Sequence, residues 1–335
     1  MSKLKAFIEG MPKCELHVHI EGTLEPEMKF QLAKRNNVKL PYKNEKALKA
    51  AYDFDDLPSF LAVYYEGMSV LLTEQDFFDV THAYLEKVRS QNVRYTEMFF
   101  DPQAHTARGV GFDTVIRGIR RAQLRAETAL GIRSQLIMCF LRDWSAEFAM
   151  TTLLQSLPYK EWIVGVGLDS DEKNNPPIKF AKVFQRARAE GYLLTMHCDV
   201  DQNDSVAHIW QTIRDIGVNR IDHGVNSLED KVLCAEIKRG LLALTVCPIS
   251  NSYVTDGSKS EAIAEMLKQG MRVTVNSDDP AYFPGYMTEN LLRVQKDVDL
   301  GKPELVRLAD NAFESAWLPR ASRDRYLAEL RAYAS

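Results

Sequence analysis

The stretch "YLLTMHCDVDQNDS" (192–205) shows the pattern that decides the fold. An apolar, β-rich run over 192–199 delivers a histidine, and a polar, acidic loop follows at once. Before it stands a segment with helical patterning, "FAKVFQRARAEG" (180–191), which ends in glycine as helices commonly do. A helix, a buried strand and a polar loop in this order are typical of a parallel sheet with crossover helices.

The same unit recurs along the chain. A second helical segment that ends in glycine, "EAIAEMLKQG" (261–270), also precedes a strand-like run. We predict eight strands, at 14–20, 93–100, 134–141, 162–169, 192–199, 219–225, 241–248 and 271–278. Eight strands that alternate with helices favour a closed (β/α)8 TIM barrel, an α/β fold, with an open doubly wound sheet as the alternative. No linker rich in Pro, Gly or Ser divides the chain, which predicts a single domain over residues 1–335.

The connection between the first two strands, residues 21–92, departs from this pattern. It is too long for a simple crossover and contains a stretch rich in aromatic residues at 54–80. One interpretation is a helical lid at about residues 40–80 over the mouth of the barrel. The other is extra packing on the outside of the barrel.

Composition and charge exclude several classes of protein. Of 335 residues, 45% are hydrophobic and 26% charged, as in ordinary soluble domains. The net charge of −4 gives no electrostatic attraction to nucleic acid or to an anionic membrane. Five cysteines without CxxC spacing argue against a disulfide framework. The N-terminal sequence does not resemble a signal peptide, and no apolar run is long enough to span a membrane. We therefore expect a cytoplasmic protein.

Polar residues gather at the ends of the predicted strands. Four of seven histidines lie there, and the last strand adds two aspartates: His17, His19, His197, His223, Asp278 and Asp279. In a barrel these ends converge on one face, and strand alternation puts His17 and His19 on the same side. Three imidazoles and a carboxylate form a credible zinc site. Any one of them alone would more often be a hydrogen-bonded structural residue, as we assume for His82, His105 and His208.

Other chemistries are poorly supported. The sequence lacks GxSxG, GxxxxGK[ST] and GxGxxG motifs, and it lacks the H-x-E and P-C-x-x-C pair of zinc cytidine deaminases. A barrel with two metals would be expected to bridge them with a lysine or an extra acid from a middle strand. The fourth predicted strand ends in "GLDS" without a lysine, which favours one metal ion per chain.

Six segments together resemble one known family. They read "PKCELHVHIEGTLEPEM", "FFDPQAHTARGV", "GLDSDEKNNPPIKF", "RIDHGVN", "LTVCPISN" and "VNSDDPAYF". Over about residues 12–318 the chain resembles the adenosine/adenine deaminases of the amidohydrolase superfamily. The resemblance is closer to the adenine deaminases, because Glu21 stands where nucleoside enzymes usually show an aspartate for the ribose.

The resemblance implies roles for individual residues. One zinc ion would be bound by His17, His19, His197 and Asp278. His223 would orient and deprotonate water on that ion, and Asp279 would hold the purine ring, with Glu21 and Asp169 as further substrate-binding residues. Zinc lowers the pKa of bound water to about 7, and a general acid must also protonate ring N1 so that C6 becomes electrophilic.

One segment departs from the family pattern. Where members normally read H-A-G-E and use the glutamate as the acid, this chain reads His197-Cys198-Asp199-Val200, so that an apolar residue occupies the acid position. Either a neighbouring aspartate has taken over the proton transfer, with Asp199 preferred over Asp201, or the protein has lost deamination. We favour the first interpretation, because the other site positions are intact.

The departure also affects the expected substrate, a small purine. An apolar side chain near the leaving group favours an N6-substituted adenine such as isopentenyladenine, with adenine second and adenosine third. A zinc-stabilised binding protein without turnover is the non-enzyme alternative. The oligomeric state stays open, with a homodimer as one option.

Overall fold

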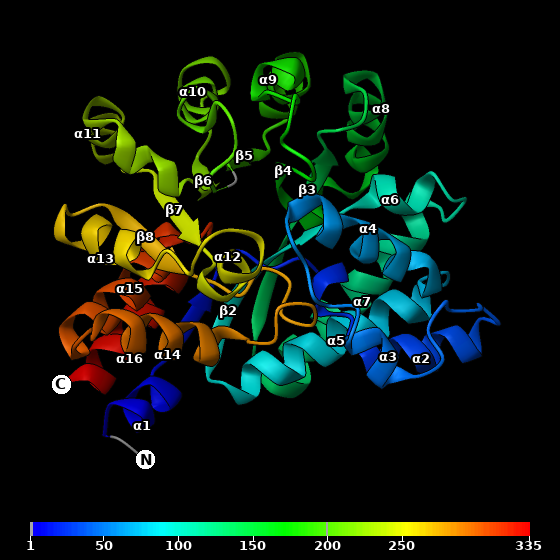
Figure 1. Ribbon diagram of the computed structural model, residues 1–335, viewed down its shortest axis with the longest axis horizontal. Coiled ribbons are helices and arrows are strands. Elements are labelled where there is room, and N and C mark those ends of the chain that lie inside the picture. Colours follow the sequence, from blue (N-terminus) through cyan, green and yellow to red (C-terminus); the bar gives the residue numbers. More distant parts are fainter. Residues whose placement is uncertain (1–2, 199) are drawn as a thin grey trace.

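The computed structural model describes residues 3–198 and 200–335. Its sheet contains eight parallel strands that are hydrogen-bonded in chain order (Figure 1). They are β1 (Lys13–Glu15), β2 (Val93–Phe100), β3 (Arg133–Leu141), β4 (Ile163–Asp169), β5 (Leu193–Cys198), β6 (Arg220–His223), β7 (Ala243–Val246) and β8 (Arg272–Val275). The predicted TIM barrel is confirmed, and the open sheet is wrong.

The barrel closes just beyond the ends of β1 and β8. A parallel bridge pairs Val18 with Asp278, and the amide of His19 donates to the carbonyl of Asp278 over 3.0 Å. The amide of Asp278 in turn donates to the carbonyl of His17 over 3.1 Å. β1 is shorter than the predicted strand at 14–20. Its register shifts between Lys13 and Cys14, and the amide of Leu16 donates to the side chain of Asn276 instead of to a strand backbone.

Helices surround the barrel (Figure 1). They are α1 (Lys3–Gly10), α2 (Pro26–Arg35), α3 (Glu45–Lys49), α4 (Leu57–Gly67), α5 (Glu74–Ser90), α6 (Pro102–Thr106), α7 (Phe112–Leu130), α8 (Ala146–Ser156), α9 (Ala181–Ala189), α10 (Ser205–Gln211), α11 (Lys231–Arg239), α12 (Pro248–Val254), α13 (Ser260–Lys268), α14 (Met287–Val298), α15 (Lys302–Ser315) and α16 (Arg320–Ala334). Gly191 and Gly270, after α9 and α13, have φ of +86° and +74°, the left-handed conformation that glycine adopts without strain.

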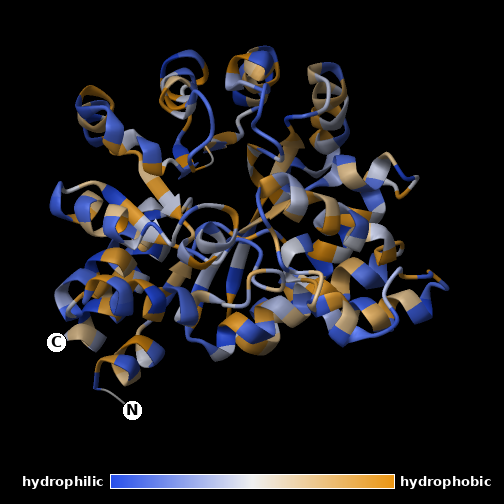
Figure 2. Cartoon of the chain, in the orientation of Figure 1, coloured by the Kyte–Doolittle hydropathy of each residue, from blue (hydrophilic) through white to orange (hydrophobic). Residues whose placement is uncertain are grey.

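The hydropathy of the outer helices agrees with their positions around the barrel. Orange and blue segments alternate around the outer helices in Figure 2, as expected where one face of each helix packs on the barrel. α7 illustrates the pattern, since Val115, Ile116, Ile119 and Ala122 are fully buried while Leu124 is 48% exposed. None of the helices in residues 3–198 and 200–335 combines the length and the apolar composition that a bilayer crossing requires.

The long connection between β1 and β2 contains α2, α3, α4 and α5. α5 packs on α7 at the outside of the barrel. α3 and α4 belong to a separate apolar cluster, in which Phe60 and Tyr64 pack against Tyr282 and Phe283 of the segment after β8. The connection therefore combines outer packing with helices that reach the C-terminal side of the strands.

Candidate active site

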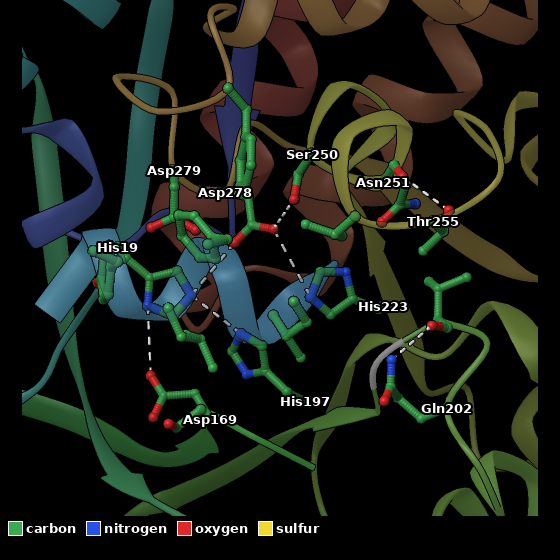
Figure 3. A pocket seen from close by; sticks show the side chains of 18 of the residues that line it. His19, Asp169, His197, Gln202, His223, Ser250, Asn251, Thr255, Asp278 and Asp279 are labelled. Carbon is green, nitrogen blue, oxygen red and sulfur yellow. Dashed lines mark hydrogen bonds and ion pairs between the residues drawn. The ribbon is translucent and has the colours of Figure 1, made fainter. Parts of the chain in front are cut away.

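Four histidines and two aspartates meet at the C-terminal ends of the strands. Figure 3 labels all of them except His17. Nε2 of His17 lies 3.2 Å from Oδ1 of Asp278, and Nε2 of His19 lies 3.5 Å from the same oxygen. Nε2 of His19 also lies 3.1 Å from Nε2 of His197. Each of these residues is buried. The structure thus brings together the histidines of β5 and of the segment after β1, as strand alternation predicted for His17 and His19.

Two of these residues have an unusual backbone conformation. His223 ends β6 with φ of 57°, and Asp278 follows β8 with φ of 65°. A residue other than glycine pays about 1–3 kcal/mol for such a conformation, which is found mainly where a site requires it. At both positions the backbone leaves the extended conformation at a residue whose side chain belongs to the cluster. Nε2 of His223 lies 3.9 Å from Oδ2 of Asp278.

The donor set fits a zinc ion. Thr245 donates its hydroxyl hydrogen to Asp222 over 2.9 Å, so it accepts from Nδ1–H of His17 over 2.8 Å. Nε2 of His17 then carries the lone pair, and this lone pair faces a carboxylate oxygen of Asp278, which is repulsive unless a cation lies between them. Ligands about 2.0–2.1 Å from a tetrahedral ion lie about 3.3 Å from one another, close to the separations found here.

Burial keeps the imidazoles of His19 and His197 in the neutral form that can bind a metal. Burial, with the neighbouring histidines, lowers the pKa of His197 well below its usual value, and burial lowers that of His19 to about 4. Both rings are therefore neutral at pH 7, the form in which imidazole binds a metal.

A buried carboxylate lies behind the cluster. Asp222 accepts from the hydroxyls of Thr195 over 2.6 Å and Thr245 over 2.9 Å, and its oxygens lie 3.7 Å from Nδ1 of His197 and 3.9 Å from Nδ1 of His17. Such outer partners fix the orientation of metal-binding histidines. We did not predict Asp222 from the sequence, although it precedes His223 in "RIDHG".

A cavity opens directly above the cluster, with about 620 Å³ of empty space that is partly open to solvent. One part of its wall is apolar and comes from α4, the loop after β5, α12 and the segment after β8: Leu57, Phe60, Leu61, Val200, Val254 and Phe283. The polar part includes His19, Asp101, Asp169, Ser170, His197, Gln202, His223, Ser250, Asn251, Asp278 and Asp279. Val200, in the family's acid position, is therefore a buried wall residue.

The two candidate acids differ in what the structure says of them. Asp199 lies outside the described residues. Asp201 does not line the cavity, and its carboxylate forms an ion pair with Lys259 at 2.6 Å and accepts from the side-chain Nδ2 of Asn226 over 3.1 Å. Its side chain is 43% exposed. Asp201 is thus engaged on the outer side of the loop.

Acidic residues surround one end of the cavity. Asp169, at the end of β4, lies 3.5 Å from Nδ1 of His19, and burial raises its pKa to about 7. Burial, together with the charge of Asp169, raises the pKa of Asp101 well above its usual value. Asp101 follows β2, so the rule that chemistry gathers at strand ends could have identified it from "FFDPQ".

Glu21 lies behind this end of the cavity instead of on its wall. Its Oε1 accepts from Nε2 of His105 over 2.8 Å and from the amide of Asp101 over 3.1 Å. Nδ1 of His105 accepts in turn from Arg108 over 2.8 Å. His105, assumed from the sequence to be a hydrogen-bonded structural residue, lies in α6 and is buried. The substrate contact suggested for Glu21 stays a prediction, and the described contacts give it a supporting position under Asp101.

Comparisons with known proteins agree with this geometry. The family model described as "Adenosine deaminase" matches residues 12–333. The chain is 52% identical over 336 residues to "Uncharacterized deaminase C1683.02" of Schizosaccharomyces pombe, covering 100% of this chain and 99% of the relative. It is 48% identical over 332 residues to an adenine deaminase of Chlorobium phaeobacteroides, covering 98% of each.

Comparison with solved structures also identifies an adenine deaminase and an amidohydrolase as similar proteins. The crystal structure of an adenine deaminase from Arthrobacter aurescens superimposes with a TM-score of 0.94 at 41% identity, covering 97% of this chain and 99% of that one. An amidohydrolase from Burkholderia ambifaria with bound zinc superimposes with a TM-score of 0.90 at 22% identity, covering 100% and 94%, and shows the shared fold.

Proposed function

Because the chain belongs to the adenosine deaminase family of purine hydrolases, we propose that it hydrolyses the C6–N6 bond of free adenine, giving hypoxanthine and ammonia. The convergence of His17, His19, His197 and Asp278 at the floor of the cavity carries the proposal. The adenine deaminases that match almost the full chain at 41–48% identity support adenine as the substrate over the other purines.

The same four residues would hold one zinc ion. Zinc in such a site lowers the pKa of water to about 7 and so supplies a nucleophile at neutral pH. His223 lies beside Asp278, and we propose that its imidazole accepts the proton of the attacking water as a general base. Asp279, on the cavity wall next to Asp278, would orient the purine ring.

The acid that protonates N1 is proposed to be Asp199. The support is indirect: Val200 has no proton to give, and the carboxylate of Asp201 is paired with Lys259 and Asn226. Of the two candidate acids Asp199 and Asp201, Asp199 therefore remains, and it stands two residues after His197 in the sequence.

Turnover by the zinc-loaded protein tests the proposal. Adenine, N6-isopentenyladenine, adenosine and N6-methyl-AMP would be followed by ultraviolet absorbance, with hypoxanthine identified by chromatography. Adenine should show the highest kcat/KM. Absence of turnover with every compound would contradict the proposal and favour the zinc-stabilised binding protein.

One observation favours a second candidate, an N6-substituted adenine. Val200 is 4% exposed and lines the cavity together with Phe60, Val254 and other apolar residues. An apolar wall can receive an alkyl group on N6, and each methylene buried there would contribute about 0.8 kcal/mol. A higher kcat/KM for N6-isopentenyladenine than for adenine would make this candidate the preferred one.

A further inference from the structure

Asp101 and Asp169 form a carboxyl pair on the wall of the cavity. Asp101 follows β2 and Asp169 ends β4, and the two are 1% and 3% exposed. One carboxylate oxygen of each residue lies within 4.8 Å of the other and of a ring nitrogen of His19. Within the described residues, neither carboxylate oxygen of Asp101 accepts from a hydrogen-bond donor, and Oδ1 of Asp169 has no nitrogen or oxygen donor. Buried acceptors of this kind are costly unless a ligand supplies the missing donor.

The surroundings of the pair are negative. In the part of the chain that the structure describes, no lysine or arginine forms an ion pair with either residue, and the charges of Glu21 and Asp279 also act on Asp101. An anionic group such as a phosphate is unfavourable in such a place, because it would add a like charge at low dielectric. A neutral ligand with N–H groups fits, because it satisfies the acceptors without adding charge.

The position of the pair indicates which N–H it receives. Asp169 lies 3.5 Å from Nδ1 of His19, the ring nitrogen that points away from the metal-binding cluster. A purine with C6 at the cluster presents its N3–N9 edge on the opposite side of the bicyclic ring. In a free base N9 carries a hydrogen, whereas in a nucleoside or nucleotide it carries the sugar.

We infer that Asp101, together with Asp169, accepts the N9–H of an unsubstituted purine base and thereby selects free bases against nucleosides and nucleotides. This inference rests on the proposed function for the placement of C6. Asp101 is then a specificity-determining residue in contact with the substrate. Glu21, which accepts from the amide of Asp101, holds that segment of backbone in place.

The experiment compares adenine with 9-methyladenine, which keeps the reacting end and lacks the N9–H. With wild-type protein, kcat/KM should be lower for 9-methyladenine by about 5- to 150-fold, the range for a buried hydrogen-bonding group that is left unpaired. Asp101→Ala should lower kcat/KM for adenine, mainly through KM, and leave or raise that for 9-methyladenine. The ratio between the two substrates should therefore fall toward one. Asp101→Asn, which keeps the shape, should also lower the ratio if the alanine variant fails to fold.

Asp215→Ala is the matched control, because Asp215 is an exposed aspartate away from the cavity. It should leave the ratio unchanged. An equal loss for both substrates in Asp101→Ala would show a purely structural role and overturn the inference. So would a second equivalent of bound zinc that disappears in this variant, because the carboxylates would then be metal ligands.

Binding of product separates this inference from the proposed function. Calorimetric titration of hypoxanthine and 9-methylhypoxanthine requires no turnover. Tighter binding of hypoxanthine to wild type, with the difference lost in Asp101→Ala, supports the inference even if adenine is not deaminated. Equal affinities for the two compounds in wild type overturn it, even if adenine is a good substrate.

Discussion

At the scale of single residues, the proposed metal-binding cluster depends on the polar side chains that contact it. Nδ1 of His17 donates to Thr245, and the hydroxyl of Thr245 donates to Asp222. This chain of two hydrogen bonds selects the tautomer that leaves Nε2 of His17 available for a metal. The hydroxyl of Thr245 is therefore part of the site, although Thr245 is not a proposed zinc ligand and does not line the cavity.

Thr245→Val tests this relay, because it keeps the shape and removes the hydroxyl. We expect zinc affinity to fall about 10- to 100-fold, the usual effect of losing an outer partner of a metal ligand. Thr245→Ser keeps the hydroxyl and should retain most of the affinity. Competition with a chelator of known affinity measures both variants. Equal affinities for the valine and serine variants would contradict the relay.

The loop after β5 gives a second prediction at this scale. Asp199→Asn should abolish deamination with zinc retained, because the proposed acid is lost while His197 is untouched. Asp201→Asn should be mild, since Asp201 pairs with Lys259 outside the cavity. Initial rates with adenine and metal content per chain measure the two effects. A dead Asp201→Asn variant beside an active Asp199→Asn variant would reverse the assignment.

Some residues of the site can be predicted from the sequence, whereas others are recognised only in the structure. His17, His197 and Asp278 were predictable, because parallel strands bring their C-terminal ends to one face wherever they stand in the chain. Asp222 and Thr245 were not, since strand residues of these types carry no distinctive signal until their neighbours across the barrel are known. The positive φ of His223 and Asp278 was also hidden, because neither residue type requires that conformation.

At the scale of elements, the strands were predicted best. The strand at 93–100 agrees with the structure at both ends, whereas β1 ends at Glu15 because side chains of the β8 segment replace part of its backbone pairing. The prediction also missed α6, a helix of 5 residues, too short to show a period of 3.6. The helices between β1 and β2 were expected, but which of them reaches the cavity depends on tertiary packing.

α4 supports the proposed lid, because Leu57, Phe60 and Tyr64 all line the cavity. Phe60→Ala should admit water and loosen the contact with Phe283, whose ring centroid lies 4.6 Å away. We expect kcat/KM for adenine to fall at least about 10-fold, mostly through KM, with zinc content unchanged; burying a phenylalanine contributes about 1.5–3 kcal/mol.

Phe78→Ala provides the control for the lid prediction. Phe78 is a half-buried aromatic residue of α5 that stacks on His82 and does not line the cavity. Its loss should leave the KM for adenine unchanged. If both variants change KM equally, α4 acts on general stability and has no particular role as a lid.

At the scale of the whole molecule, the cluster joins the two ends of the barrel. His17 and His19 follow β1, whereas Asp278 follows β8, and within the described residues a single isolated bridge pairs these two segments. A metal ion bound by both segments would therefore reinforce the part of the barrel where backbone pairing is weakest. The remaining strand pairs carry their own ladders, so the fold as a whole should not require the ion.

Removal of the metal tests whether the ion stabilises the closure between the segments after β1 and β8 without being required for the rest of the fold. The metal-free protein should keep its far-ultraviolet circular dichroism, while zinc at 100 times its dissociation constant should stabilise the fold by about 2.7 kcal/mol. Hydrogen exchange should locate the effect: the amides of His19 and Asp278, which donate across the closure, should be protected on zinc binding more than those of β3. Asp278→Ala, which removes a proposed zinc ligand, should show neither response. Uniform protection of all strands would mean that the ion stabilises the barrel globally, because then the closure and the rest of the sheet unfold as one cooperative unit.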